Sequence, residues 1–434
     1  MRGTGVDYYL HDLVPGRAEE TLVAGESAGR WTGRGSAALG LGGLVDGPGL
    51  AEVLAGRDPA GGRVLRHTRG SRPVSGFDLT FCAPKSVSVL HLLAPAELGA
   101  AAGGSHEAAV TDAVNYLERN GLGVRRVRTG EVRHLSTTGA VAAGFVHRTS
   151  RALDPHIHTH LVAANVAQGV DGTWSALDSR RLFLHRRATE AVYDASLRHH
   201  LSAAAGVGWH RGPSGGWVVD GVDPVLSRLF SQRAASIDEH AYRAGGSSST
   251  GTRRIAFHAD RPDKERGRTV DGLRSGWRHR AASMGLDLGD LVRVIGRGHV
   301  LPGRHPVDPA SLESGLAHLA ATRTRVSGRD LVVAVADAAP GGLPAGGAER
   351  AATALGAEST ELGRGREGVG ADAWDPTHLV DAVRADPGLV SRAVEGRLAG
   401  RAVDVPERDE AAARTLGRSA AFGHRGPDGG LLER

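Results

Sequence analysis

The amino-acid sequence predicts an α+β fold over residues 1–300, because segments with strand periodicity and segments with helix periodicity both occur there. Residues 77–82 (FDLTFC) alternate apolar and polar side chains, as a half-buried strand does. Two further strands are expected at 139–147 and 156–166, joined by a short turn. Residues 187–204 and 225–242 instead carry apolar side chains at helical spacing.

Each element has its own expected buried face. In the first strand Phe77, Leu79 and Phe81 face one side, and Asp78, Thr80 and Cys82 face the other. A helix is expected to open after Pro84, in the segment SVSVLHLL. The core-facing residues of the two later helices are expected to be Ala188, Ala191, Val192 and Ala195, and then Leu226, Leu229, Phe230 and Ile237.

Two changes of composition divide the chain. Residues 243–275 are Gly/Ser-rich and then charged, which is typical of a mobile loop or linker, and a second boundary is expected near 298–308. Beyond it alanine and glycine dominate. The segment 301–434 is therefore expected to be mostly helical or flexible, with short helices in 328–339 and 375–394 and a flexible stretch at 340–371.

Charge and composition restrict the function classes. The 434-residue chain carries a net charge of +5 and a pI near 9.8, which favours a polyanionic partner such as nucleic acid. Its single cysteine, Cys82, excludes an internal disulfide and fits the reducing cytoplasm. No apolar run of about 18 residues and no signal-peptide core occur, so no membrane insertion is expected. No G-x-x-x-x-G-K-[ST] loop occurs, so no ATP binding is expected.

A histidine-rich segment, HRTSRALDPHIHTH at 147–160, is the strongest local signal of chemistry. His156, His158 and His160 share one face of their strand, because strand side chains repeat every two residues. A hairpin through residues 154–155 returns the chain beside His147. Three imidazoles there can converge on one divalent cation and leave coordination positions open, as a catalytic metal requires. The alternative is a set of surface histidines among the 21 in the chain.

Two further features carry candidate chemistry. Tyr8 and Tyr9 form a pair in a chain with only five tyrosines, and a phenolic oxygen can attack phosphorus to give a phosphotyrosine ester. That ester keeps the free energy of the broken phosphodiester, so a nick can be resealed. Asp78 either accepts a proton from a tyrosine or orients a ligand histidine, although a lone acidic residue on a strand is more often an ordinary surface group.

Several motifs occur together in a fixed order. They are YYL at 8–10, GRWTGRGSAALGL at 29–41, FDLTFCAPKSVS at 77–88, HRTSRALDPHIHTHLVAANV at 147–166 and WSALDSRRLFLHRRATEAVY at 174–193. In these motifs the chain resembles the relaxase domain of the TrwC/TraI type, the MOB-F class of conjugative relaxases. The resemblance implies a His-hydrophobe-His endonuclease fold, an antiparallel sheet flanked by helices.

The resemblance also implies an activity and its partners. A relaxase of this type nicks one strand of origin-of-transfer DNA, in single-stranded or hairpin form, stays linked to the 5′ phosphate, and religates the strand by the reverse transfer. It acts in the cytoplasm and is carried into the recipient cell by a type IV secretion system, through its coupling protein and accessory transfer proteins.

Carried over position by position, the resemblance makes Tyr8 the leading nucleophile with Tyr9 as its neighbour, and makes Asp78 the acidic residue beside it. His147, His158 and His160 match the three metal ligands, for Mg²⁺ or Mn²⁺ first and Zn²⁺ or Ni²⁺ as alternatives. His156 stands where relatives usually have glutamine and is ranked below these three as an outer-shell group. The basic residues expected to contact DNA are Lys85, Arg148 and Arg151.

The chain also departs from the family pattern. The segment EETLVAGESAGRW lacks the second tyrosine pair of many relatives, and only seven residues precede Tyr8, which fits a missed upstream start or a truncated gene. Residues 308–400 resemble the linker that leads to a helicase in many relatives, but no nucleotide-binding loop follows in this sequence. The alternatives are a rolling-circle replication initiator or a transposase nickase, against which the GRW and APKS motifs argue, and a non-catalytic DNA-binding remnant.

Overall fold

The structure is a computed structural model that describes residues 28–67, 73–232, 235–236, 270–298, 306–362 and 373–397. Tyr8, Tyr9 and Ile237 lie outside the described residues. No helix within the described ranges is both long enough and apolar enough to cross a bilayer.

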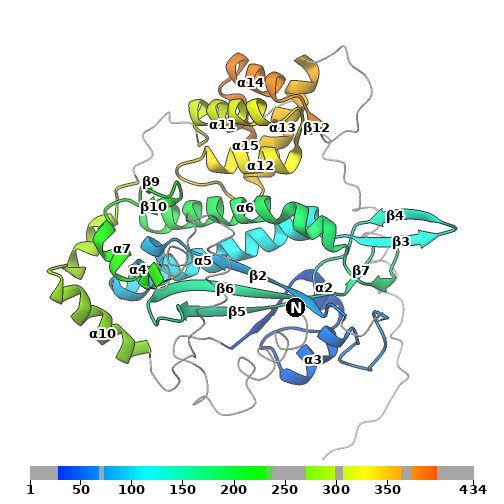
Figure 1. Ribbon diagram of the computed structural model, residues 1–434, viewed down its shortest axis with the longest axis horizontal. Helices are drawn as coiled ribbons and strands as arrows, with labels where there is room; N and C mark the ends of the chain where they lie inside the picture. The colour runs from blue at the N-terminus through cyan, green and yellow to red at the C-terminus, as the bar shows by residue number, and fades with distance from the viewer. Residues whose placement is uncertain are drawn as a thin grey trace, which may run out of the picture.

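A four-stranded antiparallel sheet forms the centre of the N-terminal part (Figure 1). Its strands lie in the order β1 (Arg30–Thr32), β5 (Ala142–Thr149), β6 (Pro155–Ala164), β2 (Gly76–Cys82). The predicted hairpin between the second and third expected strands is β5–β6. The strand expected from 139 begins only at Ala142, because the Ala140 amide donates to the Glu118 carboxylate instead of joining the ladder.

Helices cover one face of this sheet. They are α4 (Lys85–Leu93), α5 (Ala96–Tyr116) and α6 (Ser179–Ala205). Phe81, Ile157 and Leu161, which alternate with the polar positions of β2 and β6, pack against these helices in the main hydrophobic core. The apolar face predicted for β2 therefore points to the helices, and the predicted antiparallel sheet flanked by helices is confirmed.

A smaller core lies on the opposite face, under α2 (Arg34–Ala38) and α3 (Gly47–Ala55). Phe145 and Val162 of the sheet contribute to it. The GRWTGRG motif fits here for a steric reason: a Cβ atom added to Gly35 would lie 2.8 Å from the carbonyl oxygen of Ala140. The buried carboxylate of Glu118 holds this motif by accepting hydrogen bonds from the backbone amide and Nε of Arg34.

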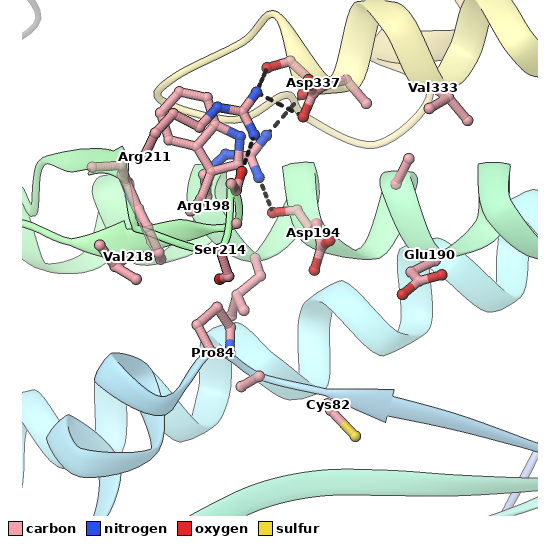
Figure 2. Close-up of a pocket in the computed structure, with 18 of the residues that line it drawn as sticks. Cys82, Pro84, Glu190, Asp194, Arg198, Arg211, Ser214, Val218, Val333 and Asp337 are labelled. Carbon is pink, nitrogen blue, oxygen red and sulfur yellow. Dashed lines mark hydrogen bonds and ion pairs between the residues drawn. The ribbon is translucent and has the colours of Figure 1, made fainter. Parts of the chain in front are cut away.

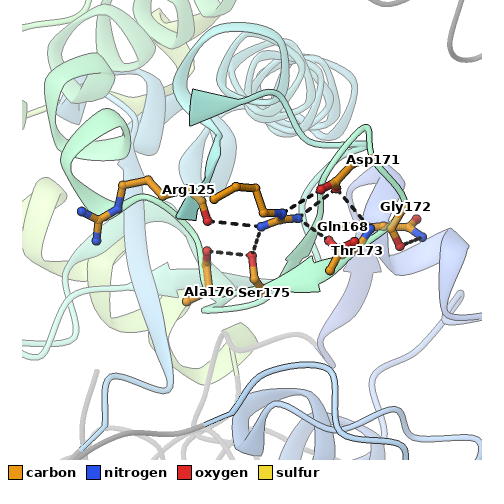
Figure 3. A network of polar contacts seen from close by, with 8 residues as sticks. Arg125, Gln168, Asp171, Gly172, Thr173, Ser175 and Ala176 are labelled. Atoms are coloured by element: carbon orange, nitrogen blue, oxygen red, sulfur yellow. Dashed lines mark hydrogen bonds and ion pairs between the residues drawn. The ribbon is translucent and has the colours of Figure 1, made fainter. Parts of the chain in front are cut away.

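A two-stranded hairpin, β3 (Val124–Arg128) and β4 (Glu131–Leu135), projects from the body of the molecule (Figure 1). Arg126 fixes its base, since its guanidinium donates to both carboxylate oxygens of Asp171 and to the hydroxyl of Ser175 (Figure 3). Asp171 lies in the turn between β7 (Ala167–Gln168) and β8 (Trp174–Ser175), and Ser175 lies in β8, so the hairpin is tied to the chain that follows β6.

Shorter elements complete the N-terminal part. They are a π-helical turn (Leu117–Gly121), β9 (Trp209–Arg211), β10 (Trp217–Val219), α7 (Pro224–Leu229), α10 (Val270–Ser283) and a 3-10 helix (Leu288–Val294). Helix α7 ends at Leu229, residues 232, 235 and 236 are helical again, and residues 237–242 of the helix expected over 225–242 lie outside the described residues. Helix α10 begins inside the segment expected to be a linker.

The C-terminal part is a packed helical unit above α6 (Figure 1). Its elements are α11 (Pro309–Thr322), β11 (Val326–Ser327), α12 (Gly328–Asp337), α13 (Gly347–Leu362), β12 (Ala373–Trp374), α14 (Pro376–Ala385) and α15 (Leu389–Val394). The expectation of a flexible stretch at 340–371 was wrong for 347–362, which is α13. Alanine favours helix, and Ala351 and Leu355 on one face of α13 are fully buried in the core of this unit.

Candidate functional site

Three histidines converge on the sheet face that is opposite to α4, α5 and α6. His147 on β5 pairs directly with His158 on β6, and His160 lies two residues further along β6. One ring nitrogen from each of the three lies within 4.8 Å of the others. The ring centroids are 5.0 to 5.2 Å apart. The register of the β5–β6 hairpin therefore produces the cluster that the histidine spacing predicted.

Hydrogen bonds set the orientation of two of these rings. Nδ1 of His160 lies 3.0 and 3.1 Å from the two carboxylate oxygens of Asp78, and Nδ1 of His158 lies 3.0 Å from the backbone carbonyl oxygen of His156. A carboxylate and a carbonyl can only accept, so both Nδ1 atoms donate. In a neutral imidazole this leaves the lone pair on Nε2, which is the atom available to a metal.

The donor set fits a divalent cation. Neutral imidazoles suit Zn²⁺, Mn²⁺ or Ni²⁺, and a ligand histidine whose second nitrogen donates to a carboxylate or a carbonyl is the usual arrangement around bound metals. Three ligands also leave positions for a substrate oxygen. His147 is nearly fully buried, while His160 and Asp78 retain 21% and 29% of their side-chain exposure, so the cluster is reached from solvent on the His160 side.

His156 lies beside the cluster and is not part of it. Its ring stacks on that of His158 with centroids 4.6 Å apart. Burial is the main cause that holds the pKa of His156 well below its ordinary value, and the neighbouring His158 and Lys85 act in the same direction. His156 is therefore a neutral imidazole packed on the ring of His158, outside the cluster of three.

The predicted basic residues occupy different environments. Lys85 begins α4 and donates from Nζ to the carbonyl oxygen of Pro155 at 2.7 Å, and burial lowers its pKa to about 8. Lys85 therefore ties α4 to the first residue of β6. Arg148 follows His147 on β5 and lies near His91 of α4. The pKa of His91 is lowered mainly by burial, and the positive charge of Arg148 lowers it further. Arg151 is in the turn between β5 and β6.

A buried polar network behind β6 was not anticipated from the sequence. His106 of α5 is fully buried, and its two ring nitrogens lie 2.8 Å from the hydroxyl oxygens of Tyr193 and Thr159. Thr159 sits on β6 between His158 and His160 and points to the opposite face. Burial lowers the pKa of His106 to about 3, so the ring is neutral.

A sequence signal for this network exists. His106 falls at helical spacing in an apolar stripe that also contains Ala102, Ala109 and Ala113, all fully buried. A histidine in such a stripe must find hydrogen-bond partners within the core. Which partners these are depends on the packing of α5 against β6 and α6.

Comparison with known proteins agrees with this geometry. Residues 2–284 match the TrwC relaxase family. The chain is 36% identical over 259 residues to the multifunctional conjugation protein TraI of Escherichia coli, a match that covers 55% of this chain and 14% of that protein. The chain thus corresponds to a small fraction of the length of this relative.

Two solved structures of the conjugative relaxase TrwC are similar to it. One, a metal-free complex with OriT DNA, has 33% identity and a TM-score of 0.56, covering 60% of this chain and 93% of that chain. The other, a copper-bound complex with OriT DNA, has 30% identity and a TM-score of 0.57, covering 66% and 98%. Because the family match spans residues 2–284, well over half of the 434-residue chain, the chain belongs to the TrwC relaxase family.

Proposed function

We propose that this chain is a conjugative relaxase that nicks one strand of origin-of-transfer DNA and reseals it. The observation that carries the proposal is the cluster of His147, His158 and His160 with Asp78 behind His160, on a sheet face that helices α4, α5 and α6 leave uncovered. The membership of the TrwC relaxase family and the OriT DNA in the similar TrwC structures support the substrate.

The covalent step assigns a role to each candidate residue. The phenolic oxygen of Tyr8 attacks the scissile phosphorus, an O–P bond forms, and the bond from phosphorus to the 3′ oxygen breaks. The phenolic proton is lost and the 3′ oxygen leaves as a hydroxyl, so the protein keeps the 5′ phosphate as a phosphotyrosine. Religation is the reverse transfer. A divalent metal held by the three histidines would supply Lewis-acid polarisation of the phosphate.

Of the two roles that the sequence left open for Asp78, the hydrogen-bond geometry favours the orientation of His160. Both of its oxygens lie within 3.1 Å of Nδ1 of His160. A carboxylate used in this way keeps His160 in the tautomer that presents Nε2. The role of proton acceptor for Tyr8 then falls to solvent or to another group.

The wider assignments rest on the same proposal. The DNA is single-stranded or folded as a hairpin, with Arg148 and Arg151 as candidate phosphate contacts and Lys85 as a weaker one because its amino group is already engaged. The strand-transfer activity belongs to residues 1–300, and the unit from 301 onward has another task. The proposed setting is the cytoplasm of the donor, with transfer to the recipient through a coupling protein and a type IV secretion system.

The proposal is tested by cleavage of a labelled single-stranded oligonucleotide that carries the origin of transfer of the parent replicon. Tyr8→Phe should abolish the covalent adduct, and Tyr9→Phe should keep most of it, because adjacent residues point in different directions. His158→Ala should abolish cleavage and retain much of the DNA affinity. His318→Ala, an exposed histidine on α11, is the matched control.

Peptide mapping of the trapped adduct identifies the nucleophile. A crosslink on Tyr9 alone would reverse the assignment of the two tyrosines. DNA binding without any metal-dependent cleavage would instead indicate a non-catalytic binding protein.

A further inference from the structure

A cavity of about 550 Å³ lies on the helical side of the molecule, away from the histidine cluster. Its walls come from α6, from the β9–β10 hairpin, from the junction of β2 and α4, and from α12 of the C-terminal unit (Figure 2). The volume is in the range of sites for small ligands. Because α12 lies beyond residues 2–284, which match the family, the cavity is completed by a part of the chain outside that match.

Two arginines that line the cavity already have hydrogen-bond or ion-pair partners. Arg198 is buried and donates to the backbone carbonyl oxygens of Asp194, Ala336 and Ala339. Arg211 donates to the carboxylate of Asp337 at 2.7 Å. The two guanidinium groups also lie 4.9 and 4.0 Å from the ring centroid of Trp217.

Two carboxylates that line the cavity form no hydrogen bond or ion pair with the described residues. Glu190 and Asp194 are one helical turn apart on α6, and their side chains point from α6 toward Pro84 and Cys82 (Figure 2). Among the described residues neither carboxylate has a hydrogen-bond or ion-pair partner. Burial raises the pKa of Asp194 to about 6. Arg198 opposes this shift, and Glu190 and Asp337 add to it.

The remaining charges do not neutralise this pair. Lys85 lines the cavity, but its Nζ donates to the carbonyl oxygen of Pro155. Arg187 is exposed, lies one turn before Glu190 on α6, and forms no ion pair with it in the described structure. Glu190 and Asp194 thus share one wall of the cavity without an ion pair of their own in the described structure, beside apolar walls from Leu197, Val218 and Val333.

We propose that this cavity binds an alkyl amine or alkyl guanidine group, whose cationic head lies between Glu190 and Asp194. A partly buried carboxylate without a partner, such as that of Asp194, is unfavourable, and a bound cation would relieve that cost, while the exposed Glu190 adds a second negative charge. The apolar walls suit the methylene stem that precedes such a head in lysine, arginine and the polyamines. A bare divalent ion fits less well, because it would fill little of the volume and would need more oxygen ligands than two side chains supply.

Titration calorimetry at pH 7.5 with the full-length chain tests the proposal. The probes are agmatine, spermidine, N-acetyl-arginine amide and, as a cation without a stem, MgCl₂. Saturable binding of agmatine is expected, weakened about tenfold or more in Asp194→Asn and Glu190→Gln. Asp381→Asn, an exposed carboxylate on α14, should bind as the parent does. Binding should also weaken from pH 7.5 to pH 5 as Asp194 takes up a proton.

The probes distinguish two sources of the cationic group, a peptide side chain and a free polyamine. Preference for N-acetyl-arginine amide indicates a basic side chain of a peptide, and preference for spermidine or agmatine indicates a free polyamine. Absence of saturable binding by all three organic cations, or equal binding by Asp194→Asn and the parent, overturns the proposal. Mg²⁺ binding that is tighter than agmatine binding and is lost in Asp194→Asn, and so does not occur at the histidine cluster, overturns it in favour of a metal site. Circular dichroism and melting curves of each variant verify that it is folded.

Discussion

Asp78 on β2 accepts a hydrogen bond from Nδ1 of His160 on β6 at 3.0 Å, although the two residues are 82 positions apart in the sequence. The hydroxyl of Thr80 lies 3.2 Å from the same nitrogen. A histidine held in this way has one tautomer and one ring orientation, so Nε2 faces the other two histidines.

Asp78→Asn is expected to weaken divalent-metal binding by about 10- to 100-fold, because an amide can donate to Nδ1 and thereby stabilise the wrong tautomer of His160. Calorimetric titration of Mn²⁺ or Zn²⁺ into the metal-free protein measures this. Thr80→Val, which removes the weaker contact, should change the affinity much less. Equal affinities of the parent and Asp78→Asn would show that Asp78 does not orient a ligand.

His106→Ala is expected to reduce the free energy of unfolding by about 2 to 4 kcal/mol, because it leaves the hydroxyls of Tyr193 and Thr159 buried without their partner and opens a cavity. Urea unfolding measures this loss. His134→Ala, a half-exposed histidine on β4, serves as the comparison and should cost well under half as much. A loss below about 0.5 kcal/mol for His106→Ala would show that the network adds little.

Arg198→Ala is expected to destabilise the chain by about 2 to 4 kcal/mol, since it removes the donor to the carbonyls at the end of α12 from a buried position. It should also loosen the C-terminal unit, which limited proteolysis after residue 298 would detect as faster cleavage. Arg186→Ala changes an exposed arginine on the same helix and should be nearly neutral. Unaltered proteolysis in Arg198→Ala would mean that other contacts hold the unit.

The ionisation of Asp194 is expected to make the chain less stable as pH rises from about 4 to 6. Its pKa in the folded state is raised to about 6, mainly by burial, so folding favours the protonated form, and that stability is lost as pH passes the folded pKa. Asp194→Asn should therefore raise the free energy of unfolding at pH 7 by about 1 to 2 kcal/mol and change it little at pH 4. Parallel pH–stability curves for the parent and Asp194→Asn would contradict this.

Much of the histidine site could be predicted from the sequence because it depends on local geometry. Residues two apart on a strand share a face, and the short turn before Pro155 brings His147 opposite His158. The same period placed Phe81 in the core and Asp78 on the other face of β2. Helical spacing likewise identified Ala188, Val192 and Ala195 as a buried face of α6.

The partners of these faces were decided by contacts between segments far apart in the chain. Local periodicity shows that a side chain is buried and does not show what covers it. Ala188, Val192 and Ala195 pack on the C-terminal unit, while Tyr193 and Leu197 of the same helix enter the main core under the sheet. Helix α6 thus contributes to two cores, and α13, expected to be flexible, packs against α12, α14 and α15 in the second of them.

Asp78 likewise depends partly on local sequence and partly on contacts between distant segments. The sequence by itself determined that its carboxylate is on the polar face of a strand, because alternation is a property of the local backbone. Only the tertiary structure provides the hydrogen bond from His160 Nδ1 to Asp78 on which the proposed role of histidine orienter rests. The pairing of Thr80 with His160 sets the register of β2 against β6, and that register, fixed by which apolar side chains enter the core, brings the carboxylate to Nδ1.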